Sequence, residues 1–337
     1  MDRKRYQLDK AWKEVIFEAS AENDTVRHSY PRVIQLLEIY EELSRQCEKN
    51  GESVRKALGI VDVVNIKGWP GQEILYSGTE YDRSSQTQFK QGEYLLSKLE
   101  LSGCSNVLDV GCGNGKTTIE LWKKNMDMCV DAFDISKDQI TVAQENLEEM
   151  EKSLKDPDHL GSIIFFTQDA MALKEQEYYD LIFSNATLHW IQDQEAIYRK
   201  MFEALIPGGK LAVHQGGAGT YQELHDLARQ AGENIGVGDK LKDWRFPARY
   251  LTEEEMTALL EKLGYVNIDV DGEVTDESEN PNLAENFATA SLIYYKDAGL
   301  TDEEFERLKE EYFRLSKDKP TITSHRLYIM AERPFKV

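Results

Sequence analysis

Short apolar segments alternate with longer amphipathic segments from about residue 90 onward. The apolar segments are rich in β-branched and aliphatic side chains, which predicts buried strands. These strands are Asn106–Val110, Met128–Asp134, Ser162–Thr167, Tyr179–Ser184 and Lys210–Gln215. The predicted helices between them are Lys116–Lys124, Lys137–Leu154 and Gln194–Leu205. This alternation predicts an α/β fold with a parallel sheet covered on both faces, whose ligands bind at the carboxyl ends of the strands.

Two capping boxes mark helix starts in the last third of the chain. Thr252, with a glutamate three residues later, opens a predicted helix that runs to about Leu263, and Thr301 opens another over residues 301–315. The predicted strands after these helices are Tyr265–Val270 and 324–332. The long, mostly helical stretch between the two strands predicts a lid built into the domain rather than a separate domain.

The first 75 residues are charged and helical in pattern. Apolar side chains recur at spacings of three and four around Leu36, which predicts one face of an amphipathic helix. A single apolar stripe cannot close a core by itself, so we expect residues 1–75 to form a helical N-terminal extension or cap. The turn signal GWPGQE at 68–73 separates this extension from the domain predicted over 76–337.

Composition and charge exclude several classes of protein. With 41% hydrophobic residues, the 337-residue chain can bury a substantial core, and its net charge of −21 repels nucleic acid and anionic lipid. No apolar run is long enough to span a membrane, and the first residues lack the apolar core of a signal peptide, so we expect a cytoplasmic protein. The four cysteines show no metal or disulfide spacing, which indicates reduced thiols.

The string VLDVGCGNGKTT at 107–118 carries the strongest chemical signal. A strand ends in Asp109, and Gly111, Gly113 and Gly115 alternate before a helix, so backbone N–H groups can approach a ligand closely. The dinucleotide fingerprint needs a glycine where this chain has Lys116, and the P-loop spacing does not fit either. The next two strands end in FDIS and TQDAMAL, and the fourth continues into SNATLHWIQD.

Together these motifs resemble the class I S-adenosylmethionine-dependent methyltransferases, over roughly residues 76–337. The resemblance implies a Rossmann-like, doubly wound sheet of seven strands with the last strand antiparallel. It also implies helical insertions on the acceptor side, at about 216–250 and 280–320. The cofactor would be S-adenosyl-L-methionine and the product S-adenosyl-L-homocysteine. The sequence gives no sign of a metal site, and it leaves the oligomeric state open.

The resemblance also implies cofactor contacts. Gly111 and Gly113 match the positions at the methionine end, and Asp109 matches the acid near the ammonium group or its loop. Asp134 matches the ribose-binding acid, and Asp169 the side chain that reads the adenine amino group. The remaining implied cofactor residues are Tyr81, Gln88, Ile135, Ala170 and Asn185.

Within the superfamily, FSNATLHWIQD and the sequence after it resemble small-molecule carboxylate methyltransferases, the group that includes trans-aconitate, malonyl-carrier-protein and juvenile hormone acid methyltransferases. We therefore expect methyl transfer to a small-molecule carboxylate, which is ionised at neutral pH and needs positioning rather than a base. Two alternatives stay open, namely C- or N-methylation of a natural-product or lipid-like acceptor, and a cofactor-binding regulator without turnover. The loop after the fourth strand lacks the proline motif of DNA amino-methyltransferases.

Candidate acceptor residues follow the fourth and fifth strands and continue in the predicted lid. His189, His214 and Arg245 are the candidate catalytic residues, and Arg249 lies four residues after Arg245. Pro247 between the two arginines predicts a bent loop that presents both toward the cleft. Each candidate has a structural alternative: the histidines can be core hydrogen-bonding groups, and the arginines can pair with surface acids such as Glu253.

Overall fold

The computed structural model describes residues 78–153, 161–317 and 321–336, all within one compact unit, Tyr76–Val337. Nothing of the predicted N-terminal extension is among them, so that extension stays a prediction. Side chains are described from Gln88 onward.

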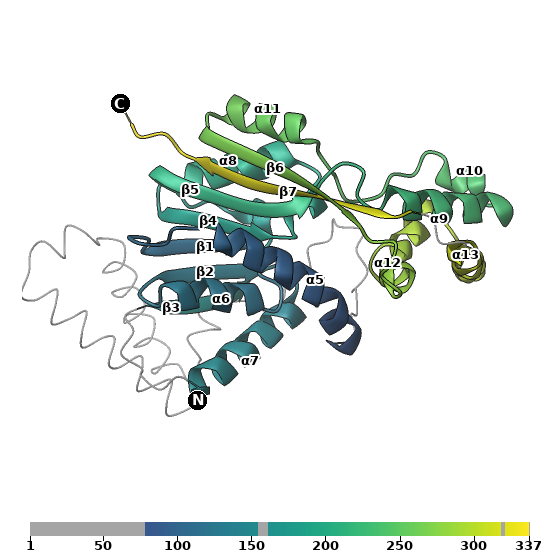
Figure 1. Ribbon diagram of the computed structural model, residues 1–337, viewed down its shortest axis with the longest axis horizontal. Helices are drawn as coiled ribbons and strands as arrows, with labels where there is room; N and C mark the ends of the chain where they lie inside the picture. Colours follow the sequence, from purple (N-terminus) through teal and green to yellow (C-terminus); the bar gives the residue numbers. More distant parts are fainter. Residues whose placement is uncertain (1–77, 154–160, 318–320, 337) are drawn as a thin grey trace, which may run out of the picture. The chain divides into compact units, whose positions relative to one another are not determined.

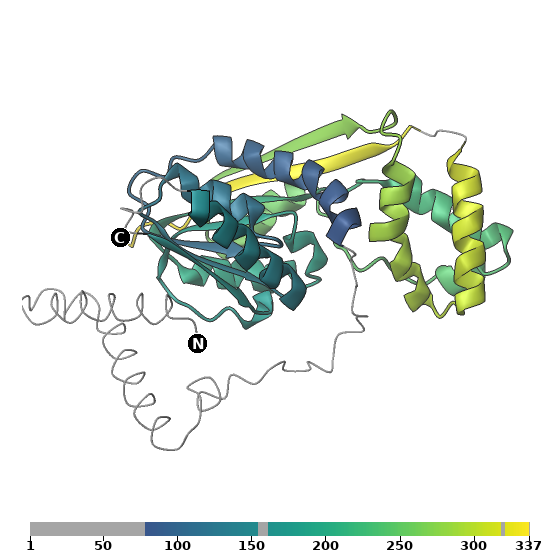
Figure 2. The same cartoon turned by 90° about the horizontal axis from the view of Figure 1, so that it is seen from below.

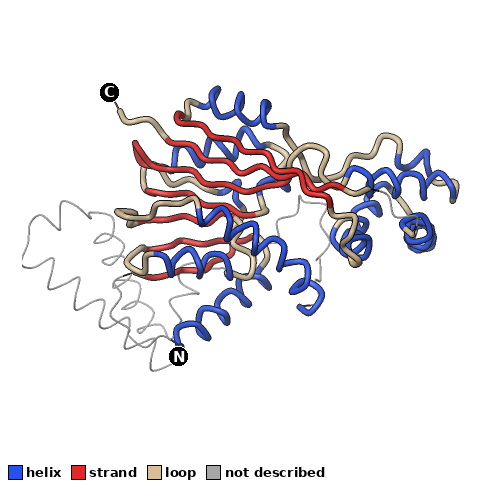
Figure 3. The backbone as a smooth tube through the Cα atoms, viewed as in Figure 1, coloured by secondary structure: helices blue, strands red, loops and turns tan. Residues whose placement is uncertain are grey.

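A single sheet of seven strands forms the centre of this unit (Figures 1 and 3). Its strands are β1 (Asn106–Val110), β2 (Cys129–Asp134), β3 (Ser162–Thr167), β4 (Tyr179–Asn185), β5 (Leu205–Gly216), β6 (Val266–Asp276) and β7 (Thr323–Glu332). Their order across the sheet is β3-β2-β1-β4-β5-β7-β6. Strands β1 to β5 pair in parallel, whereas β7 is antiparallel to both of its neighbours. The seven-stranded, doubly wound fold implied by the resemblance is confirmed.

Helices cover both faces of the sheet (Figure 2). On one face lie α5 (Gly78–Ser97), α6 (Lys116–Lys124) and α7 (Lys137–Ser153), and on the other lie α8 (Gln194–Ala204) and α11 (Glu253–Leu263). Short 3-10 helices, η1 (Ala170–Ala172) and η2 (Leu188–Trp190), follow β3 and β4. Apolar side chains of the strands alternate between two buried clusters, one beneath each helical layer, as expected for a sheet buried on both faces.

A third buried cluster joins the two acceptor-side insertions. It is built from α9 (Gln222–Asn234), α10 (Gly238–Leu241), α12 (Leu283–Ala290), η3 (Leu292–Ala298) and α13 (Asp302–Ser316). Figure 1 shows these helices together beyond one end of β6 and β7. Helices α9 and α13 pack against each other although about 70 residues separate them in sequence. The insertions therefore have an apolar core of their own, and we call them the helical lid.

The predicted element bounds agree closely with the structure except at two strands. β5 begins at Leu205, five residues before the predicted start, because the turn-like Pro207–Gly209 forms a bulge inside the strand, with Gly208 at φ +84°. β6 continues to Asp276, six residues beyond the prediction. Its extension is an exposed edge strand with polar side chains on both faces, so it lacks the alternating pattern that predicts strands.

Gly115 illustrates how tightly α6 is fitted to the sheet. Its φ is +74°, and a Cβ atom there would lie 2.7 Å from Phe165 Cζ and 2.8 Å from Ala143 Cβ. Both distances are shorter than side-chain contacts allow. A glycine at the start of α6 is therefore required by conformation and by space.

We predict that Gly115→Ala lowers the free energy of unfolding by about 2–4 kcal/mol, since it adds a steric clash to left-handed backbone strain. Gly103→Ala is the matched control, because Gly103 has φ +85° but nothing within 4 Å of its added Cβ. The control should lose only about 1–2 kcal/mol. Chemical denaturation of both variants measures the difference, and equal losses would contradict the packing argument.

Candidate functional site

The carboxyl ends of the parallel strands bring the predicted cofactor residues to one edge of the sheet. Strand order reverses between β1 and β4, so the loops after these strands diverge to opposite faces and leave a crevice there. The glycine loop follows β1, Asp134 ends β2, Asp169 follows β3, and Asn185 ends β4.

The glycine loop is tied to the neighbouring strands on both sides. Gly111 N–H and Cys112 N–H donate to the Phe133 carbonyl at 2.8 and 2.9 Å. On the other side, Thr187 Oγ1 donates to the Gly111 carbonyl at 2.9 Å, and a Cβ on Gly111 would lie 2.1 Å from Thr187 Cγ2. The loop therefore has no room for a side chain at Gly111, whose φ is +74°.

Asp134 is held in a fixed orientation by the backbone. Its Oδ2 accepts from Gly113 N–H at 3.0 Å, and its Oδ1 accepts from Ser136 N–H at 2.9 Å. Burial raises the pKa of this carboxyl, and the backbone hydrogen bonds oppose that rise. Each carboxylate oxygen has a second lone pair, so Asp134 can still accept two hydrogen bonds from a ligand.

Asp109 is buried below the glycine loop. Its Oδ2 accepts a 2.6 Å hydrogen bond from Thr118 Oγ1, and its Oδ1 has no partner in the described part of the chain. Burial raises the pKa of Asp109 to about 7, the Thr118 hydrogen bond lowers it, and the charge of Asp134 adds to the rise. A nearby cation would favour the ionised form of this carboxyl.

Around these acids, Asp169 caps η1 by accepting from Met171 N–H at 2.8 Å, so its side chain is fixed beside Ala170. Ile135 is 62% exposed, which is unusual for an isoleucine directly after a buried strand. Gln88 contributes its carbonyl, which accepts from Asn185 Nδ2 at 3.0 Å. Tyr81 lies in α5, and its side chain is outside the described residues.

Asn185 connects this region to His214 at the end of β5. Asn185 Oδ1 lies 2.8 Å from His214 Nδ1, while the amide nitrogen of Asn185 donates to Gln88. Because an amide oxygen only accepts, His214 Nδ1 carries the proton and its buried Nε2, which has no partner among the described residues, holds a lone pair. Burial holds the pKa of His214 well below its ordinary value, and Arg326 lowers it further.

His189 has the opposite tautomer. Gly216 N–H donates to His189 Nδ1 at 3.3 Å, which leaves the proton on Nε2. Packing among protein atoms lowers the pKa of His189 to about 3, with a further contribution from Arg326. The ring stacks on Tyr250, with the ring centres 5.6 Å apart. Both predicted histidines are thus brought to the end of β5, and both are neutral.

The comparisons with known proteins agree with this arrangement. A family model described as a methyltransferase domain matches residues 101–264. Malonyl-[acyl-carrier protein] O-methyltransferase 1 of Ilyobacter polytropus is 27% identical over 264 residues, which cover 75% of this chain and 90% of the relative. Malonyl-[acyl-carrier protein] O-methyltransferase of Bacillus anthracis is 30% identical over 165 residues, which cover 48% of this chain and 57% of the relative.

These matches support a class I S-adenosylmethionine-dependent methyltransferase. The cofactor of such an enzyme is S-adenosylmethionine. Among solved structures, phosphoethanolamine N-methyltransferase 2 of Haemonchus contortus in complex with S-adenosyl-L-methionine matches 73% of this chain and 52% of its own, with 18% identity and a TM-score of 0.45.

A cluster of aromatic rings lies between η2 and the helical lid. The Trp190 ring centre lies 5.4 Å from that of Tyr294 and 5.8 Å from that of Phe246. Trp244 continues the cluster to Tyr295, at 4.5 Å. The structure thus brings together rings from η2, from the loop after α10 and from η3.

The two predicted arginines lie in the loop between α10 and α11. Residues 242–250 form a loop without a helix, as Pro247 predicts. Arg245 is exposed and donates to the carbonyls of Lys242 and Trp244 in its own loop. Arg249 donates to the Gln192 carbonyl at 3.2 Å. No carboxylate in the described part of the chain lies within ion-pair distance of either arginine, so they do not pair with Glu253.

Three residues of the site were missed by the sequence analysis: Thr187, Tyr250 and Arg326. Thr187 lies in the SNATLHW segment, and its contact with Gly111 depends on how two loops approach each other. Arg326 lies in the polar first half of the predicted closing strand 324–332, and nothing in the local pattern distinguishes it from a surface residue.

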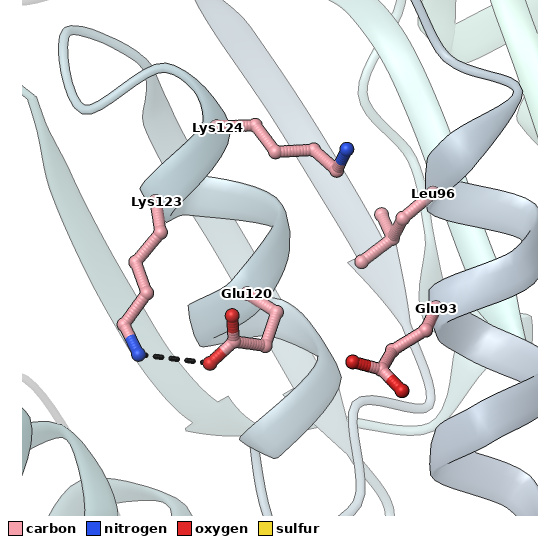
Figure 4. A pocket seen from close by; sticks show the side chains of 5 residues that line it. All are labelled: Glu93, Leu96, Glu120, Lys123 and Lys124. Carbon is pink, nitrogen blue, oxygen red and sulfur yellow. Dashed lines mark hydrogen bonds and ion pairs between the residues drawn. The ribbon is translucent and has the colours of Figure 1, made fainter.

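A surface groove between α5 and α6 lies away from this site (Figure 4). It is lined by Glu93, Leu96, Glu120, Lys123 and Lys124, and Lys123 pairs with Glu120 at 2.8 Å. Helix α6 begins at the glycine loop and ends at Lys124, so its last turn lies toward the opposite edge of the sheet. The groove is not part of the methyltransferase site.

Two further features of the described chain concern its helices and its cysteines. None of its helices combines the length and apolar character needed to cross a bilayer. Cys104, Cys112 and Cys129 are free thiols.

We predict that His189 remains neutral down to pH 5, that His214 titrates well below its ordinary range, and that the two rings carry their protons on different nitrogens, Nε2 and Nδ1 respectively. The reason is that both pKa values are lowered by burial beside a cation. Two-bond ¹⁵N–¹H spectra of histidine-labelled protein, assigned with His→Gln variants, report both properties. Titration of either ring near pH 6.5, or one shared tautomer, would contradict the hydrogen-bond assignment.

Proposed function

We propose that this methyltransferase transfers a methyl group to a carboxylate oxygen of a small-molecule or carrier-linked acid. The observation that carries the proposal is the character of the acceptor end of β5. There a cationic Arg326 lies near two imidazoles that are neutral and hydrogen-bonded. The end of β5 therefore presents one guanidinium charge beside two imidazoles whose lowered pKa values make them weak proton acceptors. The names of the relatives, which act on malonyl-[acyl-carrier protein], support the same chemistry.

The residues at the carboxyl ends of β1 to β4 fit the cofactor. Asp134 keeps two lone pairs for the paired ribose hydroxyls, and exposed Ile135 beside it suits the face of an adenine ring. The unpartnered Oδ1 of buried Asp109 suits the neighbourhood of a cationic ligand. Gly111 and Gly113 would border the methionine end, with Asn185 facing them from β4. When bound, S-adenosylmethionine supplies an electrophilic methyl group on a sulfonium.

The protein's own part in the reaction is to bind, align and exclude water. A carboxylate is already ionised at neutral pH, so its oxygen can form the new bond to the methyl carbon while the carbon–sulfur bond breaks and its electron pair goes to sulfur. No proton is transferred in this step. Alignment at attack distance is worth about 7–11 kcal/mol in favourable cases. His189 Nε2–H is available to donate to the second acceptor oxygen.

The aromatic cluster favours a second candidate within the same cofactor chemistry. Trp190, Phe246 and Tyr294 offer partly exposed rings that suit a large apolar acceptor. Methylation of an amine or carbon acid, however, would need a group that accepts a proton. An apolar acid fits both the aromatic rings and the low pKa values of the two imidazoles. An apolar amine fits only the aromatic rings.

An acceptor panel tests the proposed function. The full chain is incubated with methyl-labelled S-adenosylmethionine and a malonyl thioester, trans-aconitate, medium- and long-chain fatty acids, and amines of matched chain length. We expect base-labile methyl esters from at least one acid and no labelled amine. Label only in amines would refute carboxylate methylation while leaving methyl transfer intact.

We predict that Asp134→Ala weakens S-adenosylhomocysteine binding about 10- to 100-fold, which corresponds to about 1.5–3 kcal/mol for lost hydrogen bonds to a charged group. Asp138→Ala is the control, since it removes the same charge from an exposed position on α7. Calorimetry should show the control within twofold of the parent protein. Unchanged binding in Asp134→Ala would refute the ribose assignment.

A further inference from the structure

Arg326 reaches the acceptor end of the site from the last strand. In the β5–β7 register it lies opposite Gly216, whose N–H donates to His189. Its charge lowers the pKa values of His189, His214 and Tyr250, which lie around the end of β5. Antiparallel pairing of β7 therefore brings a guanidinium group to the edge of the sheet where the acceptor is expected.

The helical lid supports this guanidinium group from the other side. Arg326 Nη1 donates to Thr220 Oγ1 at 3.1 Å, and Nη2 donates to the Tyr221 hydroxyl at 3.0 Å. The Tyr221 ring also packs against it, with 5.3 Å from the guanidinium carbon to the ring centre. Tyr221 is the N-cap of α9 and has φ +52°, a left-handed conformation that a tyrosine adopts only where its surroundings impose it. The arginine is thus held by neutral groups in a fixed orientation.

Glu273 lies opposite Arg326 in the β6–β7 register, but its carboxylate accepts from the Tyr328 hydroxyl at 3.2 Å and forms no ion pair with the guanidinium group. No carboxylate in residues 78–153, 161–317 and 321–336 lies within ion-pair distance of it, and its buried Nε has no acceptor there. Arg333 on the same segment shows the usual arrangement, pairing with Glu177 at 2.8 Å and donating to main-chain carbonyls. In a chain of net charge −21, a partly buried arginine whose hydrogen bonds go only to neutral groups is available to bind an anionic ligand.

We propose that Arg326 binds the carboxylate of the methyl acceptor and that Thr220 and Tyr221 hold its guanidinium group for that contact. The inference rests on the proposed function, because it names the residue that binds the carboxylate acceptor of that reaction. A guanidinium fork can bind both oxygens of a carboxylate, which fixes the direction of the attacking oxygen as well as its affinity. Arg326 replaces Arg245 as the acceptor-binding arginine, since Arg245 is exposed and donates within its own loop.

Kinetics of Arg326→Gln and Arg326→Lys give the first test, using the best acid from the acceptor panel. We expect Arg326→Gln to lower kcat/KM about 100-fold, mainly through KM, while Arg326→Lys recovers part of the loss because it keeps the charge without the fork. Affinity for S-adenosylhomocysteine should stay within twofold in both variants, which also shows that they are folded. Arg199→Gln, at an exposed arginine on α8 paired with Glu195, is the control and should match the parent protein.

Tyr221→Phe tests the support of the guanidinium group. It removes one hydroxyl and keeps the ring, and we expect a KM rise of about 10-fold with kcat changed less. Equal kinetics of Arg326→Gln and the parent protein would overturn the inference and leave carboxylate methylation standing.

Binding of malonate, trans-aconitate and octanoate to the protein saturated with S-adenosylhomocysteine gives a test without turnover. Binding that Arg326→Gln weakens at least 10-fold supports carboxylate binding by Arg326, and the absence of methylation of the same acid would then refute the proposed function alone. Equal binding of the acids by Arg326→Gln and by the parent protein overturns the inference. The absence of both binding and turnover for every acid overturns the inference and the proposed function together.

Discussion

The return of the chain at the end of β1 is the constraint on which the site depends. To start α6 there, the backbone turns through three glycines with positive φ, and the loop must fit between Phe133 on β2 and Thr187 after β4. The same turn directs Gly113 N–H at the Asp134 carboxylate. A tight turn required by the fold therefore also orients the main acid of the proposed cofactor site. A change that disturbs this turn should affect both folding and cofactor binding.

The proposed acceptor side depends on contacts between segments far apart in sequence. Its polar groups come from strand ends and from a helical lid that has an apolar core of its own, and they meet only because β7 runs antiparallel beside β5. His189 and His214 are kept neutral by burial and by the nearby cation. Such a site attracts an anion and offers it hydrogen-bond donors, but it does not provide an imidazole base. That combination suits an acceptor which arrives already ionised.

Local patterns predicted most of the fold because they report on groups that are close in sequence. The glycine loop, the strand-end acids Asp134 and Asp169, and both capping boxes are of this kind, and the structure places each in the predicted element. The end of β6 was missed because an exposed edge strand has no alternating pattern. Arg326 was missed because its position depends on strand pairing across more than 100 residues, and a pairing register is not visible in either segment alone.

The central claim is that the crevice between β1 and β4 binds the cofactor with its reactive end toward the end of β5. A crystal structure of the full chain with S-adenosylhomocysteine tests this most directly. The account predicts both ribose hydroxyls on the Asp134 carboxylate, the amino acid end along Gly111–Gly113, and the sulfur atom facing His189 and Arg326. A nucleoside bound elsewhere, or a sulfur atom that faces away from the end of β5, would contradict it.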